Sequence, residues 1–252
     1  MTTVLITRPL EASLQLANLL DPCGIHPIVM PLYTFLPRDP GLDMHEALAG
    51  LESRKLAVFT SPRAVQFGLE HIPPDLQGKL EFAAVGPATR ALLETAGHQV
   101  GVQARSGFTA EDLLQVPELA AAPGEAVIFC APAGRTKLAR GLRDLGWTVS
   151  MAMVYQRQPQ RPAQHLIDEL IGAQGLLSVW TSVSAFELAR EYLPAAVWSK
   201  ILNAPALVIS TRIKHHLQQA GATRVALAEE PGNTGLFQLI QAESSNKRTA
   251  SN

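Results

Sequence analysis

The sequence predicts an α/β protein built around parallel sheets. Short apolar runs rich in β-branched residues recur along the chain, and a segment of helical periodicity follows each of them. The runs lack the polar and apolar alternation of a half-exposed strand, which indicates strands covered by helices on both faces. The predicted strands are 4–6, 56–59, 83–85, 127–129, 176–180 and 206–209.

Each predicted strand is followed by its own helix. After 4–6, apolar residues recur at steps of four and three, from Leu10 and Leu14 to Ala17 and Leu20. This spacing places them on one face of a helix. The apolar faces of the five later helices contain Ala64, Ala88, Leu138, Phe186 and Ile213.

The chain also contains an internal repeat. Five pairs of segments match in the same order, at offsets of 121 to 125 residues: 4–9 with 127–132, Tyr33 with Tyr155, 59–64 with 180–185, 85–97 with 209–221, and 109–114 with 234–239. The sequence therefore predicts two copies of one set of β-α units, 4–114 and 127–239. Each copy has the length of a small domain and is too long for a solenoid repeat.

Two segments interrupt the strand-helix rhythm at equivalent places. Residues 31–37 and 154–159 are flanked by prolines, which disfavour helix on either side. They are predicted to be strands or linkers between the modules. Residues 244–252 are polar without periodicity and are predicted to be a disordered tail.

Composition excludes several classes of protein. A chain of 252 residues forms one large or two small domains, and 47% apolar with 17% charged residues excludes general disorder. The net charge of −1 argues against a nucleic-acid binder. We expect no membrane span and no export signal. Cys23 and Cys130 have no metal or disulfide spacing, so we expect no metal site and a cytoplasmic location.

Candidate site residues follow the predicted strands. In parallel sheets, ligands bind beyond the carboxyl ends of the strands, where helix N-termini present free N–H groups. The segments at these places carry hydroxyls or arginines: 7–8, 60–63, 86–89, 132–135, 181–184 and 210–212. The alternative for each hydroxyl is a helix cap, as for Ser61 before Pro62 or Thr109 with Asp112. Arginine outnumbers lysine 15 to 6, which suits carboxylate recognition, although genome composition can produce the same ratio.

The sequence contains none of the common catalytic motifs. GxGxxG, GxxxxGK[ST], HExxH and GxSxG are all missing from the printed chain. Tyr155 is one of three tyrosines and repeats the position of Tyr33. For Tyr155, packing between the modules is the alternative to a functional role.

Taken together, these segments resemble the uroporphyrinogen-III synthase family, whose members cyclise hydroxymethylbilane without a cofactor. The most specific pieces are 59–65, 84–89, Gly134-Arg135 with Leu138, and 153–156. The likeness extends from residues 4–9 to residues 233–236.

The resemblance implies two flavodoxin- or Rossmann-like parallel-sheet domains joined by a two-stranded β-ladder linker. One domain would comprise 1–35 plus 160–243 and the other 36–159, with the active site in the cleft between them. Tyr155 corresponds to the family's catalytic tyrosine, and Ser61, Arg63, Thr89 and Ser182 correspond to its substrate contacts. Position after the strands adds the following candidates for substrate binding: Thr7, Arg8, Arg135, Ser210, Thr211 and Arg212. Some family members have Gly-Pro where this chain has Ser210-Thr211, so the resemblance does not define the role of Thr211.

The implied reaction is the cyclisation of hydroxymethylbilane to uroporphyrinogen III, with loss of water and inversion of ring D. Its substrate carries eight carboxylates, which predicts a locally positive site. The expected partners are this linear tetrapyrrole and, transiently, hydroxymethylbilane synthase; we expect a monomer that binds neither nucleic acid nor membrane. The alternative is a two-lobed protein that binds a small anion without catalysis.

Overall fold

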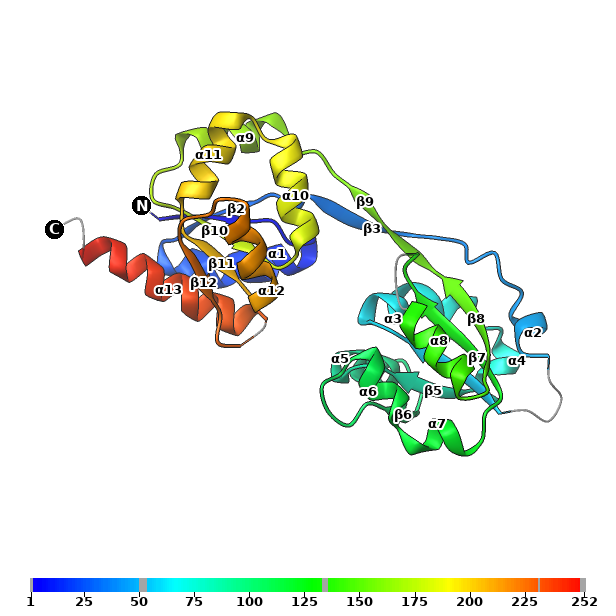
Figure 1. Cartoon of the computed structure of the whole chain (residues 1–252). Coiled ribbons are helices and arrows are strands. Elements are labelled where there is room, and N and C mark those ends of the chain that lie inside the picture. Colours follow the sequence, from blue (N-terminus) through cyan, green and yellow to red (C-terminus); the bar gives the residue numbers. More distant parts are fainter. Residues whose placement is uncertain (1, 50–53, 133–135, 231, 250–252) are drawn as a thin grey trace. The chain divides into compact units, whose positions relative to one another are not determined.

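In a computed structural model, the chain divides into two units of α/β structure (Figure 1). The structure describes residues 2–49, 54–132, 136–230 and 232–249. Residues 1–34 with 158–252 form one unit, called here the terminal unit, and residues 35–157 form the middle unit.

The terminal unit contains a five-stranded parallel sheet in the order β12-β11-β10-β1-β2. Its strands are β1 (Thr3–Ile6), β2 (His26–Val29), β10 (Leu176–Trp180), β11 (Ala206–Val208) and β12 (Val225–Leu227). Numbered along the chain, these strands have the order 2-1-3-4-5, which is that of flavodoxin-like sheets. The order reverses between β1 and β10.

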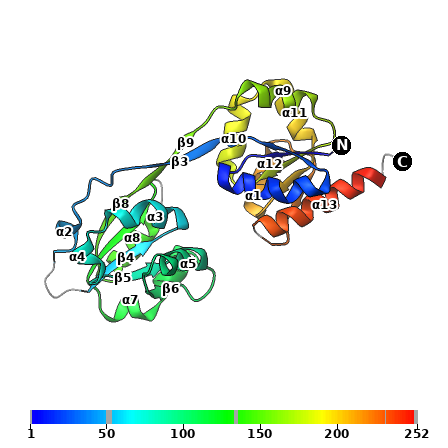
Figure 2. The same ribbon diagram turned by 180° about the vertical axis from the view of Figure 1, so that it is seen from behind.

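Helices cover both faces of this sheet (Figures 1 and 2). On one face α1 and α13 pack against the strands, where Leu16 and Leu236 join a buried cluster with Val4 and Ile6. On the other face Trp180 meets Phe186 of α10 edge to face, with ring centroids 5.0 Å apart. The helices are α1 (Leu10–Leu20), η1 (Asp21–Cys23), α9 (Gln164–Gly172), α10 (Val183–Tyr192), α11 (Ala195–Asn203), α12 (Thr211–Gln219) and α13 (Asn233–Thr249).

Helix α13 extends further than the sequence predicts. Residues 244–252 were expected to be a disordered tail, but α13 continues to Thr249. Leu236, Ile240 and Ser244 recur every fourth residue and are all buried, so the helix keeps one face against the unit beyond the expected end. The last three residues lie outside the described part of the chain.

The middle unit contains a second five-stranded parallel sheet, in the order β6-β5-β4-β7-β8. Its strands are β4 (Lys55–Phe59), β5 (Glu81–Ala84), β6 (Val100–Gln103), β7 (Glu125–Cys130) and β8 (Thr148–Met153). Along the chain this is the order 3-2-1-4-5 of Rossmann-like sheets, and it reverses between β4 and β7.

Two buried clusters lie on opposite faces of the middle sheet. Ala57 and Phe59 of β4 point into the cluster that α3 and α5 cover, whereas Leu56 and Val58 point into the cluster under α6, α7 and α8. Every β4 residue after Lys55 is therefore buried, which explains why this strand is continuously apolar. The helices are α2 (Met44–Ala47), α3 (Pro62–Gly68), η2 (Leu69–His71), α4 (Pro74–Gln77), α5 (Pro87–Thr95), α6 (Ala110–Leu114), α7 (Pro117–Ala121) and α8 (Thr136–Asp144).

The two proline-flanked segments pair with each other. They form β3 (Tyr33–Pro37) and β9 (Tyr155–Pro159), a separate two-stranded sheet. Arg38 N donates to Val154 O and Gln160 N donates to Leu32 O, both at 2.9 Å, which makes the pair antiparallel. The predicted fold class, two parallel-sheet units with a β-ladder linker, is confirmed.

The two sheets are assembled from both copies of the internal repeat. By the repeat, β1 and β2 correspond to β7 and β8, and β10, β11 and β12 correspond to β4, β5 and β6. The orders β12-β11-β10-β1-β2 and β6-β5-β4-β7-β8 then match strand for strand. Each unit therefore takes two strands from one copy of the repeat and three strands from the other copy.

Candidate active site

The point where strand order reverses is marked in each unit by a buried threonine. In the terminal unit, Thr7 follows β1, and its hydroxyl donates to Val179 O of β10 at 2.9 Å. In the middle unit, Thr60 follows β4, and its hydroxyl donates to Phe129 O of β7 at 3.0 Å. Doubly wound sheets bind their ligands at these places. Thr7 was expected to contact substrate, but the residue is buried and its hydroxyl bonds the neighbouring strand, which supports a structural role.

Ser61 and Tyr155 meet beside the reversal point of the middle unit. Ser61 begins α3, and its Oγ accepts a hydrogen bond from Ala64 N at 3.1 Å, with Pro62 at the first helical position. The Tyr155 hydroxyl at the start of β9 lies 3.1 Å from the same Ser61 Oγ. Ser61 therefore caps a helix and also contacts the candidate catalytic tyrosine.

Aromatic side chains fix the ring of Tyr155. Phe35 packs on it edge to face with centroids 5.6 Å apart, and Phe67 stacks on it at 5.8 Å. The guanidinium of Arg63 lies 5.1 Å from the centre of the Phe35 ring and donates to Gln66 Oε1. Ser61, Arg63 and Tyr155 are thus brought together in the middle unit.

The terminal unit contains a second tyrosine–serine pair. Ser182 follows β10 and caps α10, with its Oγ accepting from Ala185 N at 3.1 Å. The hydroxyl of Tyr33, at the start of β3, lies 3.5 Å from this Ser182 Oγ. Tyr33 was not among the predicted site residues, although the repeat aligned it with Tyr155.

Arg8 follows β1 and is half-buried at the same edge of the terminal sheet. Its Nη1 donates to Asn233 Oδ1 at the start of α13, and Asn233 Nδ2 donates to Gln15 Oε1 at 3.2 Å. Burial lowers the pKa of Arg8, and the electrostatic interaction with the neighbouring Tyr33 acts in the opposite direction. Within the described ranges, Arg8 makes no ion pair with a carboxylate.

The remaining predicted residues lie in other strand-end segments. Thr89 is buried in the first turn of α5. Ser210 caps α12 through a 3.4 Å bond from Ile213 N, and the exposed Thr211 and Arg212 follow it. Arg135 lies outside the described residues.

Neither a metal centre nor a membrane segment is found in the described part of the chain. No group of three or more His, Cys, Asp or Glu side chains is placed there to hold a metal ion. None of the described helices is both long enough and apolar enough to cross a membrane.

The fold and the strand-end residues define a two-unit α/β protein that suits an anionic ligand. Two doubly wound units carry tyrosine–serine pairs and half-buried arginines at the edges where such sheets bind ligands, which suits a polar, anionic ligand. The family model described as uroporphyrinogen-III synthase HemD matches residues 15–238. The chain therefore belongs to the uroporphyrinogen-III synthase family, and it is a cyclising lyase of tetrapyrrole biosynthesis.

Two solved structures have folds similar to that of this chain. A uroporphyrinogen-III synthetase from Helicobacter pylori matches with a TM-score of 0.68 and 18% identity over 96% of this chain and 99% of its own. A mutant uroporphyrinogen III synthase from Thermus thermophilus matches with a TM-score of 0.62 and 17% identity over 98% of this chain and 100% of its own. The comparisons give no support to the alternative of a binding protein without catalysis.

Proposed function

We propose that this chain converts hydroxymethylbilane to uroporphyrinogen III with Tyr155 as its catalytic residue and Ser61 as the partner of Tyr155. The observation that carries the proposal is the 3.1 Å contact between the two hydroxyls. Ser61 Oγ accepts the Ala64 N–H, and its own O–H can donate to the Tyr155 oxygen. The Tyr155 O–H can then donate to the substrate.

The first step is the loss of the terminal hydroxyl of the substrate. The carbon–oxygen bond breaks, the electron pair leaves with the oxygen, and the proton of Tyr155 completes a water molecule. The Ser61 O–H stabilises the phenolate that develops on Tyr155. The azafulvene that remains is attacked by the substituted carbon of ring D, and the resulting spiro intermediate opens and recloses with ring D inverted. The proton lost on final closure restores Tyr155.

Choosing the product isomer requires positioning of the substrate. The azafulvene closes unaided to the symmetric type I isomer, so the enzyme must hold ring D in the geometry that leads to type III. Such positioning contributes about 7–11 kcal/mol in favourable cases. We assign the binding of the substrate carboxylates and polar edges to strand-end residues of both units: Arg8, Arg63, Thr89, Arg135, Ser182, Ser210, Thr211 and Arg212.

We further propose that the enzyme is a cytoplasmic monomer with domains 1–35 plus 160–243 and 36–159. Cys23 and Cys130 are the two cysteines of the sequence and are far apart without metal or disulfide spacing, which suits a reducing compartment. The exchange of strands between repeat copies completes both sheets within one chain, which supports a monomer. Because the substrate closes unaided, transient contact with hydroxymethylbilane synthase would shorten its exposure to solvent.

The test is an isomer assay with freshly made hydroxymethylbilane under anaerobic conditions. The wild-type chain should give type III product, separated from type I by chromatography. Tyr155→Phe should remain folded and lose roughly 10²–10⁴-fold in kcat, the range of a general acid. The control is Tyr192→Phe, which alters a half-buried tyrosine that lies against Arg161. Wild-type turnover in Tyr155→Phe would refute the assignment of Tyr155.

A further inference from the structure

Two strand-end loops lie side by side at the reversal point of the terminal sheet. Strands β1 and β10 are paired in register, with Ile6 opposite Val179. Arg8 lies two residues beyond Ile6, and Ser182 lies three residues beyond Val179. These two side chains therefore come from adjacent loops at the edge where sheets of this topology bind ligands.

The hydroxyl of Tyr33 lies close to the hydroxyl of Ser182. The distance of 3.5 Å between the two oxygens is longer than the 2.7–2.8 Å of a typical hydroxyl–hydroxyl hydrogen bond. Since Ser182 Oγ accepts the Ala185 N–H, the Ser182 O–H is a donor toward other groups. Two hydroxyls at this separation can donate to one oxygen atom of an incoming acceptor.

Arg8 supplies the charge of this arrangement. Its side chain is half-buried, and the partner of its guanidinium is the neutral amide of Asn233, which Gln15 in turn holds. No carboxylate neutralises Arg8 among the residues that the structure describes. A half-buried cation whose only partner is neutral is stabilised when an anion binds to it. The planar guanidinium of Arg8 has the geometry that suits a carboxylate.

We propose that Arg8, Tyr33 and Ser182 form a carboxylate-binding subsite of the terminal unit, which takes one side-chain carboxylate of the linear tetrapyrrole. This inference rests on the proposed function, because it names the group of that substrate that is bound. Tyr33 is a positioning residue in this subsite, whereas its repeat equivalent Tyr155 acts in the chemistry. By the repeat, Ser61 and Tyr155 of the middle unit correspond to Ser182 and Tyr33, whereas Arg8 corresponds to Ala131.

The test separates binding from catalysis in steady-state kinetics with hydroxymethylbilane. Arg8→Gln should raise KM about 10- to 100-fold and Tyr33→Phe about 3- to 10-fold, each with kcat within threefold of wild type. Arg8→Lys should recover part of the loss, since it keeps the charge. The double variant should raise KM by less than the product of the two single effects, because both residues contact one carboxylate.

Arg161→Gln and Tyr192→Phe are the matched controls. These residues form a second arginine–tyrosine pair in the terminal unit, with the guanidinium 4.6 Å from the ring centre, and neither is among the proposed substrate-binding residues. If the Arg8 and Tyr33 variants behave as these controls do while wild type forms type III product, the subsite is refuted and the proposed function stands. A fall in kcat without a change in KM also refutes a binding role. If wild type forms only type I product, the proposed function itself fails.

Thermal unfolding of each variant shows whether the variant is still folded. Should Arg8→Gln prove unfolded, Arg8→Lys and Tyr33→Phe make the same comparison with smaller perturbations. In that case an unchanged KM in both refutes the subsite, and a raised KM in both supports it.

Discussion

The hydroxyl oxygens of Ser61 and Tyr155 lie 3.1 Å apart, although the two residues are 94 positions apart in the chain. Ser61 has two roles at this contact, because its Oγ also caps α3. A substitution at Ser61 should therefore affect both stability and turnover, whereas a substitution at a simple cap should affect stability alone.

Ser61→Ala should lower the free energy of unfolding by about 1 kcal/mol, the usual effect of losing a cap. It should also lower kcat, by less than Tyr155→Phe does, because the tyrosine keeps its proton and loses only a partner. Thr109→Ala, at the cap of α6 in the same unit, is the control for stability. Urea denaturation and isomer-resolved kinetics measure the two effects. Equal kcat values for Ser61→Ala and Thr109→Ala would contradict the role of Ser61.

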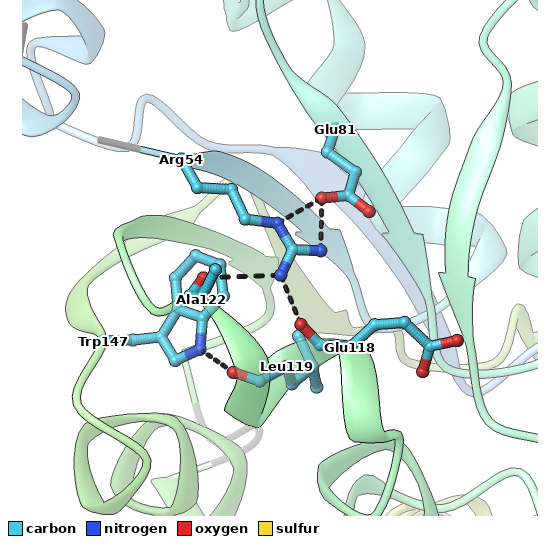
Figure 3. A network of polar contacts seen from close by, with 6 residues as sticks. All are labelled: Arg54, Glu81, Glu118, Leu119, Ala122 and Trp147. Carbon is cyan, nitrogen blue, oxygen red and sulfur yellow. Dashed lines mark hydrogen bonds and ion pairs between the residues drawn. The ribbon is translucent and has the colours of Figure 1, made fainter. Parts of the chain in front are cut away.

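Arg54 is the centre of a polar network at the opposite, amino-terminal edge of the middle sheet (Figure 3). Its Nε donates to Glu81 Oε2 at 2.6 Å, and its Nη1 donates to the carbonyl oxygens of Glu118 in α7 and of Ala122 just after α7. Its guanidinium also lies over the Trp147 ring, 5.3 Å from the centre. The network connects the starts of β4 and β5 to α7.

Arg54→Met should lower the free energy of unfolding by roughly 2–3 kcal/mol, because it leaves the half-buried Glu81 carboxylate and two carbonyls without their donor. Glu81→Gln should lower the free energy of unfolding by less than Arg54→Met does, since an amide oxygen still accepts a hydrogen bond from Arg54. Both proteins should keep the kcat and KM of wild type when folded, because the network lies at the edge away from the site. Denaturant titrations and kinetics at 20 °C or below check this prediction. A selective loss of activity in stable protein would contradict it.

The cap of α6 should make stability depend on acid pH. Thr109 and Asp112 form a capping box, and the hydrogen bonds from Thr109 hold the pKa of Asp112 below its usual value. A carboxylate with a lowered pKa in the folded state stabilises the fold above its unfolded pKa and ceases to do so as pH falls through the folded pKa. Asp112→Asn should therefore melt below wild type near pH 7, and the difference should shrink below about pH 4. A difference that stays constant down to pH 2 would contradict this mechanism.

The inner strands of both sheets could be predicted from the sequence, but the edge strands could not. The predicted strands correspond to β1, β4, β5, β7, β10 and β11, whereas β2, β6, β8 and β12 are the outer strands of the two sheets. An outer strand has one hydrogen-bonded neighbour and is only partly covered, so it needs fewer apolar residues. Pro27 in β2 and Gly101 in β6 further interrupt the apolar pattern.

The candidate site could be predicted only in part, because the sequence shows which residues follow a strand but not what their side chains contact. Hydroxyls and arginines after strands could be found from their position, and Ser61 and Ser182 indeed lie at strand ends next to tyrosines. Sequence position could not distinguish a hydroxyl that is available to a ligand from one that bonds the neighbouring strand, as that of Thr7 does. The pairing of Arg8 with Asn233 was also hidden, because 225 positions separate the two residues. The repeat that aligned Tyr33 with Tyr155 was the signal that could have identified Tyr33.

Thr7→Val tests whether the buried threonine at the reversal point acts on the substrate or on the fold. Valine has nearly the same shape but no hydroxyl, so it leaves the Val179 carbonyl without its 2.9 Å donor. The free energy of unfolding should fall by about 1–2 kcal/mol, while KM and kcat stay within threefold of wild type. Thr60→Val, which removes the corresponding bond to Phe129 in the middle unit, should behave in the same way. A KM raised tenfold in Thr7→Val with unchanged stability would instead assign its hydroxyl to substrate binding, because the bond between the strands would then contribute little to the fold.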